Sequence, residues 1–87
     1  MTDLSLKVRY FAGAAAAAGT SEQVLEVSGE STLAEVVTRL GEDNPDLARV
    51  LSVASFLSEG QPVSDRQLPL AQLPAPQLDV LPPFAGG

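Results

Sequence analysis

The stretch that decides the fold is TLAEVVTRLG, Thr32 to Gly41, because it carries the pattern of the main helix. Thr32 and Glu35 match a capping box, in which the threonine hydroxyl accepts the Glu35 N–H and the glutamate side chain returns to the cap. Gly41 is expected to supply a left-handed residue that ends the helix. We therefore predict a helix of about nine residues. The apolar residues recur at the spacing of one helical face: Leu33, Val36, Val37 and Leu40.

Two strand patterns precede this helix. Apolar and polar side chains alternate from Leu4 to Phe11, which is the period of a half-buried strand. The chain alternates again from Gln23 to Ser28, where Leu25 and Val27 are predicted to face the core. Between these strands lies an alanine run at residues 13–19, which is bounded by glycines. Because isolated helices this short are marginal in water, we expect one helical turn there at most.

Shorter elements are expected after the helix. Asn44-Pro45-Asp46 predicts a loop or a single turn. The stretch from Leu51 to Leu57 reads as a third strand, and residues 61–64 as a short segment that pairs back on it. Three prolines in residues 65–77 predict a long irregular loop, since proline removes a backbone donor. Leu78 to Leu81 is the last predicted strand.

These elements predict an α+β fold, a mixed sheet covered on one face by one main helix. The chain has 87 residues, enough for one domain, and we divide it into a folded body at 1–81 and an extended tail at 82–87. If the last strand lies beside the first, Asp79 shares the open face of the sheet with Lys7 and Arg9. A surface ion pair there would be worth about 0–1 kcal/mol.

Composition excludes several kinds of site. The chain has no cysteine and no histidine, so disulfides, thiol nucleophiles, zinc sites and imidazole catalysis are not expected. We predict no metal site and no catalysis by this chain alone. The net charge of −6 argues against a nucleic-acid partner. No signal-peptide pattern and no long apolar run is present, so no membrane association is predicted and the cytoplasm is the expected compartment.

The last eight residues, VLPPFAGG, carry the candidate function. Pro82 and Pro83 favour an extended rod that costs little entropy to thread into a slot. Phe84 is suited to anchor that rod in a partner's pocket, although it could also fold back onto its own sheet. Gly86 and Gly87 have no side chain to obstruct a narrow channel. The alternative interpretation of the two glycines is a frayed end or a leftover linker.

The terminal carboxylate of Gly87 is then the reacting group. With an ordinary pKa of about 3.3–3.7 it is ionised and a poor acyl donor, so it must be activated. Transfer to the α-phosphate of ATP would give an electrophilic acyl-adenylate. An incoming sulfur could then replace that oxygen and leave a thiocarboxylate.

Three stretches, LSLKVRYFA, the Thr-x-x-Glu helix and VLPPFAGG, resemble the MoaD/ThiS family of ubiquitin-like sulfur carriers. The ending most resembles the small subunit of molybdopterin synthase. The resemblance implies a β-grasp fold and adenylation of Gly87 by a MoeB/ThiF-type enzyme that uses ATP and Mg. It also implies a persulfide sulfur donor and a MoaE-like large subunit that receives the tail and uses the sulfur to form the molybdopterin dithiolene. No cofactor is expected on this chain itself.

The predicted site therefore has two parts. The reacting end comprises Gly86 and Gly87. The predicted partner-binding residues are Pro82, Pro83, Phe84, Ala85, Phe11 and Leu81.

Some features depart from the family, and other functions stay open. LPAPQLDV stands where family members usually carry a Gly-Asp turn, and ASFLSEG replaces an asparagine-containing turn. The first helix of the family is reduced here to the alanine run. The same tail chemistry serves sulfur carriers for thiazole or cysteine biosynthesis, and a ubiquitin-like modifier would instead join Gly87 to a lysine. A plain interaction module with an inert tail is the remaining alternative.

Overall fold

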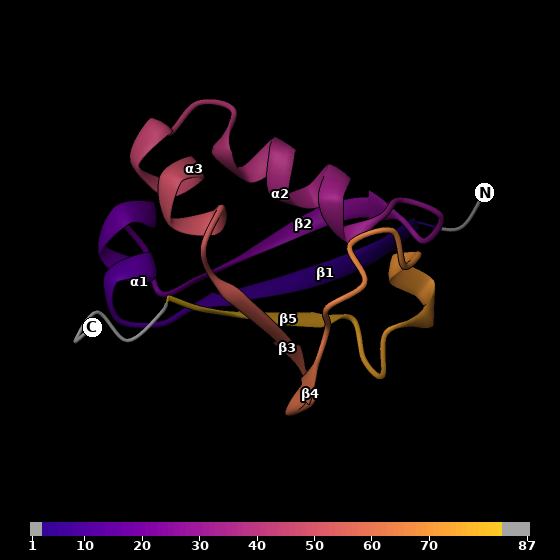
Figure 1. Ribbon diagram of the computed structural model, residues 1–87. Helices are drawn as coiled ribbons and strands as arrows, with labels where there is room; N and C mark the ends of the chain where they lie inside the picture. Colours follow the sequence, from indigo (N-terminus) through magenta and orange to yellow (C-terminus); the bar gives the residue numbers. More distant parts are fainter. Residues whose placement is uncertain (1–2, 83–87) are drawn as a thin grey trace.

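The computed structural model describes residues 3–82 of the chain (Figure 1). This part of the chain contains five strands, three α-helices and one short 3₁₀ helix, which lies just before the last strand. The strands are β1 (Asp3–Tyr10), β2 (Glu22–Ser28), β3 (Ser55–Ser58), β4 (Gln61–Pro62) and β5 (Gln77–Leu81). The helices are α1 (Gly13–Ala18), α2 (Leu33–Gly41) and α3 (Pro45–Leu51), and the 3₁₀ helix is η1 (Leu70–Gln72).

The strands form one mixed sheet in the order β2-β1-β5-β3-β4. β5 runs parallel to β1, whereas the other neighbouring strands are antiparallel. The last strand therefore lies beside the first, which is the condition for the predicted ion pair of Asp79, and it occupies the centre of the sheet. The brief return of β4 onto β3 is confirmed as well, since Ser58 pairs with Gln61.

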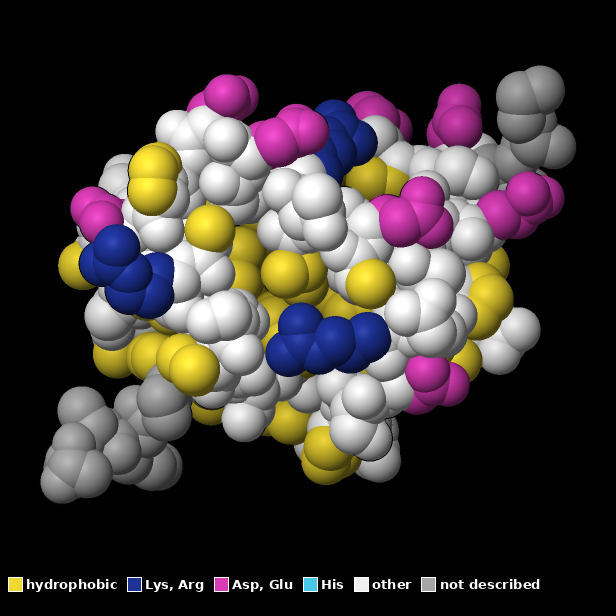
Figure 2. Space-filling model, turned by 45° about the horizontal axis from the view of Figure 1, so that its top comes forward, with side chains coloured by type: hydrophobic (Ala, Val, Ile, Leu, Met, Phe, Trp, Pro, Cys, Tyr) yellow, Lys and Arg dark blue, Asp and Glu magenta, His cyan; other side chains and the backbone are white. Residues whose placement is uncertain are grey.

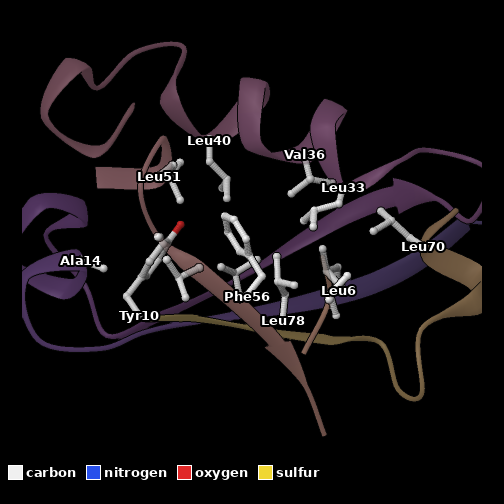
Figure 3. Close-up of a cluster of buried hydrophobic side chains, with 14 of the residues drawn as sticks. Leu6, Tyr10, Ala14, Leu33, Val36, Leu40, Leu51, Phe56, Leu70 and Leu78 are labelled. Carbon is white, nitrogen blue, oxygen red and sulfur yellow. The ribbon is translucent and has the colours of Figure 1, made fainter. Parts of the chain in front are cut away.

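The helices gather on one face of this sheet, with α2 and α3 above it and α1 at one end (Figure 1). The core lies between these helices and the inward side chains of the strands. Figure 3 shows side chains of α2 pointing toward the sheet, and the residues that are at most 4% exposed there include Leu6, Leu33, Val36, Phe56 and Leu78. The predicted α+β architecture is confirmed.

The capping box at the start of α2 is present. The Glu35 backbone N–H donates to the Thr32 hydroxyl at 3.3 Å, and the Thr32 N–H donates to the Glu35 carboxylate at 3.1 Å. The helix has the predicted nine residues. Gly41 is the last residue of α2, as predicted, but the prediction of a left-handed residue there was wrong, because its φ is not positive. Gly41 instead permits close packing, since a Cβ built on it would lie 2.7 Å from the Cβ of Ala48.

The segment after α2 was predicted incorrectly as a loop or single turn. It forms α3, a seven-residue helix that begins after Asn44, whose side chain accepts a hydrogen bond from the Leu47 N–H at 3.1 Å. Pro45 follows at the first helical position, where its missing N–H costs nothing. Leu47 and Leu51 are four residues apart and both are buried. The third strand consequently starts at Ser55, because Leu51 belongs to the helix.

The prediction of at most one helical turn for the alanine run was also wrong, because the helix found there is longer. The run forms α1, six residues long, which ends at Gly19 with a φ of 78°. Ala14 is fully buried, and the Asn44 side-chain amide donates to the carbonyl oxygen of Ala17 at 2.8 Å. Contacts with the rest of the fold thus stabilise a helix that would be marginal alone.

The loop between β4 and β5 is irregular, as predicted. It is nevertheless attached to the body, because Leu70 and Leu73 are buried in the core and the Ala34 N–H donates to the Arg66 carbonyl oxygen at 2.9 Å. The loop therefore closes one end of the core.

Candidate functional site

The candidate site begins where β5 ends. Val80 is fully buried and lies opposite Tyr10 of β1 on one side and Phe56 of β3 on the other. Leu81 still pairs with Ser55. A central strand that is paired on both sides has little freedom to move. The chain therefore leaves the sheet at Pro82 from a fixed base, beside α1 (Figure 1).

Phe11 and Leu81 lie together at this base. The Phe11 N–H donates to the Val80 carbonyl oxygen at 3.2 Å. Because Tyr10 lies opposite Val80 in the parallel pair, the next residue of each chain segment falls on the open face of the sheet. Phe11 is 36% exposed there, and Leu81 and Pro82 are partly buried. The structure thus brings the two predicted body residues, Phe11 and Leu81, to one end of the sheet.

Three side chains form a connected row on the open face next to this base. The Arg9 Nε lies 3.9 Å from the Asp79 Oδ1, which confirms the predicted ion pair, and the Asp79 side chain is only 14% exposed. The Arg9 Cζ lies 5.3 Å from the centroid of the Phe11 ring, within the range of a cation–π interaction. Through Arg9, the row connects the Phe11 ring to Asp79 of β5. Sequence reasoning missed the Arg9–Phe11 contact, although their i, i+2 spacing on one strand face was an available signal.

The turn that follows Phe11 stops β1 at this point. Ala12 has a φ of 51°, which is unusual for a residue other than glycine. The Ala14 N–H then donates to the Phe11 carbonyl oxygen at 3.0 Å as α1 begins. Both backbone groups of Phe11 are therefore engaged, and its side chain is free to serve as a contact.

Tyr10 lies on the inner side of the same corner, near Ala14 (Figure 3). It is 3% exposed, and its hydroxyl donates to the Gln23 Oε1 at 3.3 Å. Burial raises the pKa of the Tyr10 phenol above its ordinary value of 10.0. The phenol therefore stays neutral at physiological pH and acts as a structural support for the corner.

The other predicted site residues lie outside the described part of the chain: Pro83, Phe84, Ala85, Gly86 and Gly87. Within residues 3–82, no group of histidine, cysteine or acidic side chains is arranged to hold a metal ion. None of the helices in that same range is long and apolar enough to cross a membrane.

Comparison with known proteins gives structural neighbours only. No family model matches the chain, and no curated protein matches its sequence. The small archaeal modifier protein SAMP1 from Methanosarcina acetivorans is 25% identical, with both chains covered completely and a TM-score of 0.72. The HVO 2177 protein from Haloferax volcanii is 23% identical over 98% of this chain and 88% of its own, with a TM-score of 0.78.

A further neighbour comes from Pyrococcus furiosus and is described as a proposed molybdopterin converting factor, subunit 1. It is 18% identical over 93% of this chain and 99% of its own, with a TM-score of 0.74. The five-stranded mixed sheet with its helices on one face is the ubiquitin-like β-grasp of these proteins. The fold implied by the sequence resemblance is therefore confirmed.

Proposed function

Because this chain is a MoaD/ThiS-like protein with the ubiquitin fold, we propose that it carries sulfur as a thiocarboxylate on Gly87. The observation that carries the proposal is the continuity of β5 with the tail. A central strand fixed on both sides continues directly into Pro-Pro-Phe-Ala-Gly-Gly. A fixed base reduces the entropy lost when the tail enters a partner's channel. The terminal glycines leave no side chain beside the reacting carboxylate.

The proposed chemistry needs outside enzymes. An activating enzyme of the MoeB/ThiF type, using ATP and Mg, transfers the Gly87 carboxylate to the α-phosphate of ATP with loss of pyrophosphate. The outer sulfur of a persulfide donor then attacks the carbonyl and AMP leaves. A thiol breaks the remaining sulfur–sulfur bond and releases the thiocarboxylate. This chain contributes no cysteine or histidine to any of these steps, so it acts as a carrier and not as a catalyst by itself.

The favoured acceptor is the pterin precursor of molybdopterin, with this chain as the small subunit of molybdopterin synthase. The Pro-Pro-Phe-Ala-Gly-Gly ending and the likeness to the Pyrococcus furiosus protein support this assignment. A MoaE-like large subunit would contact Phe11, Leu81 and the tail and would receive Gly87. Carriers for thiazole or cysteine biosynthesis would differ in the large partner and not in the tail chemistry.

A second candidate function is a ubiquitin-like protein modifier. It is favoured by the likeness to SAMP1, a protein named as a modifier, which is 25% identical over the whole length of both chains. In this case the amine of a target lysine attacks the acyl-adenylate, AMP leaves and an isopeptide bond forms with Gly87. The two functions share the activation step and differ in the nucleophile.

Mass spectrometry of the full chain distinguishes these functions. The chain is incubated with ATP, Mg, a MoeB/ThiF-type enzyme and a sulfide source. The carrier shows exchange of one oxygen for sulfur at Gly87, the modifier shows a bond to lysine, and an unchanged chain would contradict both. Gly86→Val should block the reaction, whereas Gly13→Val is a matched control, because a Cβ at Gly13 meets no atom within 4 Å.

Deletion of Gly87 tests whether the last residue acts apart from the folded body. We expect no thiocarboxylate and an unchanged melting temperature, because the residue follows the paired end of β5. Sulfur transfer by the shortened chain would refute the proposed role of Gly87.

A further inference from the structure

β2 is an edge strand, and its register shows which backbone groups point away from the sheet. The Tyr10 N–H donates to the Ser21 carbonyl oxygen at 2.8 Å, and Val8 lies opposite Gln23 in the same ladder. Hydrogen-bonded pairs alternate in an antiparallel ladder, so the odd-numbered residues of β2 bond to β1. The even-numbered residues direct their N–H and C=O groups outward: Glu22, Val24, Glu26 and Ser28.

Four of these eight outward groups have a local partner. The Thr20 hydroxyl bonds to both backbone groups of Glu22, at 2.9 Å and 3.4 Å. The Arg39 Nη1 donates to the Glu26 carbonyl oxygen at 3.2 Å, and the Ser31 N–H donates to the Ser28 carbonyl oxygen at 3.0 Å. Over residues 3–82, no hydrogen bond engages the Val24 N–H, the Val24 C=O, the Glu26 N–H or the Ser28 N–H. The middle of β2 is therefore an open pairing site.

The opening carries one exposed apolar side chain, has carboxylates on either side of it, and faces Lys7 of β1 across the ladder. The Val24 side chain is 56% exposed on the open face of the sheet. A hollow of about 370 Å³ lies between the end of β2 and α2. It is lined by Glu26, Glu35 and Asp3 together with one cation, Arg39. Acidic side chains also crowd the upper margin of the face that carries α2 (Figure 2).

We propose that the β2 edge binds an extended, basic segment of a partner protein as an added strand. A residue opposite Val24 would exchange two backbone hydrogen bonds with it, and its side chain would lie against the exposed valine. Side chains two positions to either side fall opposite Glu22 and Glu26 on the same face. A basic side chain opposite Glu26 would be attracted to a carboxylate that accepts from the Ser5 hydroxyl at 2.6 Å, and one opposite Glu22 would share its carboxylate with Lys7, whose Nζ lies 3.6 Å from the Glu22 Oε2. The expected segment thus has basic residues two positions before and after an apolar one.

A second copy of the chain does not fit this edge. Antiparallel pairing of two β2 strands about Val24 would place Glu22 of one copy opposite Glu26 of the other, on both sides of the centre. Like charges directly opposite one another are destabilising in a sheet. The same carboxylates that favour a basic segment therefore oppose self-pairing.

Arg39 limits this site in two ways. Its guanidinium occupies the outward side of the Glu26 carbonyl oxygen, where an added strand would continue. It is also the one cation lining the acidic hollow. Replacing Arg39 by methionine keeps most of the stem but removes the donor and the charge. Arg39→Met should therefore bind a basic strand more tightly, whereas a site that depends on Arg39 would be weakened.

The test is an NMR titration of the full-length, ¹⁵N-labelled chain with a capped heptapeptide, Thr-Arg-Thr-Val-Thr-Arg-Thr. We expect the largest amide shifts at Val24 and Glu26 and weaker binding as salt increases. Val24→Pro removes the outward N–H without removing a bond between β1 and β2. It should weaken binding about two- to twelvefold, the range of one net hydrogen bond. Val24→Thr keeps the N–H and is the matched control.

A second probe needs no change in the protein. The same peptide with an N-methylated central valine cannot donate to the Val24 carbonyl oxygen and should bind about two- to twelvefold more weakly. The proposal is overturned if this peptide or Val24→Pro binds like its control, if glutamate in place of both arginines binds equally well, or if the shifts centre on Phe11. Concentration-dependent pairing of the free chain through β2 would overturn it as well. Deletion of Gly87 should leave peptide binding unchanged, so this proposal and the proposed sulfur carrier can fail separately.

Discussion

Gly41 offers a sharp test of how α2 and α3 pack. It lies in the last turn of α2, directly against Ala48 of α3. A Cβ at position 41 would lie 2.7 Å from the Ala48 Cβ and 3.0 Å from its Cα. The Cα is a backbone atom, so the clash cannot be relieved by rotating a side chain. Gly41→Ala must therefore move one helix relative to the other.

Two opposing effects set how much Gly41→Ala changes the free energy of unfolding. Alanine gains about 1 kcal/mol over glycine in a helix interior. Overpacking in a close-packed contact costs about 1–3 kcal/mol, and contact with the Ala48 backbone puts this case near the upper end. The free energy of unfolding should therefore fall by about 1–2 kcal/mol. For a domain of this size, each kcal/mol lowers the melting temperature by about 4–8 °C.

Urea unfolding of four proteins measures this effect as a double-mutant cycle: the parent chain, Gly41→Ala, Ala48→Gly and the double variant. With the Ala48 methyl removed, Gly41→Ala should lose most of its cost, which gives a coupling of at least about 1 kcal/mol. A glycine needed for left-handed backbone would instead cost the same in both backgrounds. That result, or a higher melting temperature for Gly41→Ala, would refute the packing argument.

Three further predictions concern the core, the open face and alkaline pH. Leu33→Ala should lower the free energy of unfolding by about 2–5 kcal/mol in urea, because Leu33 is fully buried, whereas exposed Val24→Ala should change it by less than about 0.5 kcal/mol. Arg9→Glu should cost up to about 1 kcal/mol at low salt, and a loss that does not shrink with salt would contradict a screened ion pair with Asp79. Burial raises the pKa of Tyr10 above 10.0, so its contribution to stability is complete below pH 10.0 and is lost as pH rises through the higher folded-state pKa. Tyr10→Phe should remove that part of the alkaline loss in thermal unfolding, and an unchanged alkaline slope would show that the buried phenol is not its cause.

Local chemistry explains which elements were predictable. The capping box of Thr32 and Glu35 acts within one helical turn, and the alternation from Leu4 to Phe11 reflects a sheet with one buried face. Either pattern can be recognised without knowing what packs against it. The same alternation led to the correct placement of Asp79 near Arg9, because pairing the first and last strands determines which side chains share a face.

The errors have a common cause in contacts between distant segments. α1 and α3 have only six and seven residues, so their local propensities could not predict them with certainty. Asn44 joins the two, because its side chain caps α3 and also donates to the Ala17 carbonyl oxygen. Gly41 does end α2, but it was interpreted as a left-handed residue, whereas it lets Ala48 approach closely.

The residues of the candidate site also fall into two groups, those suggested by the sequence and those brought together only by the tertiary structure. The prediction for the tail, from Pro82 to Gly87, rests on residue types alone, and every residue of it after Pro82 lies outside the described part of the chain. The row of Asp79, Arg9 and Phe11 at the base of the tail needed the parallel pairing of β1 with β5.

By itself, the sequence determined the period of each strong element and the lack of thiol and imidazole side chains. These properties follow from bonds and side chains within a few residues of one another. The tertiary structure alone decided that β5 is the central strand and that Val24 lies on an open edge of the sheet. It also decided that the short helices α1 and α3 form in addition to α2. Each of these depends on which distant segments share a surface, and the free energy of such contacts is absent from any local stretch of the chain.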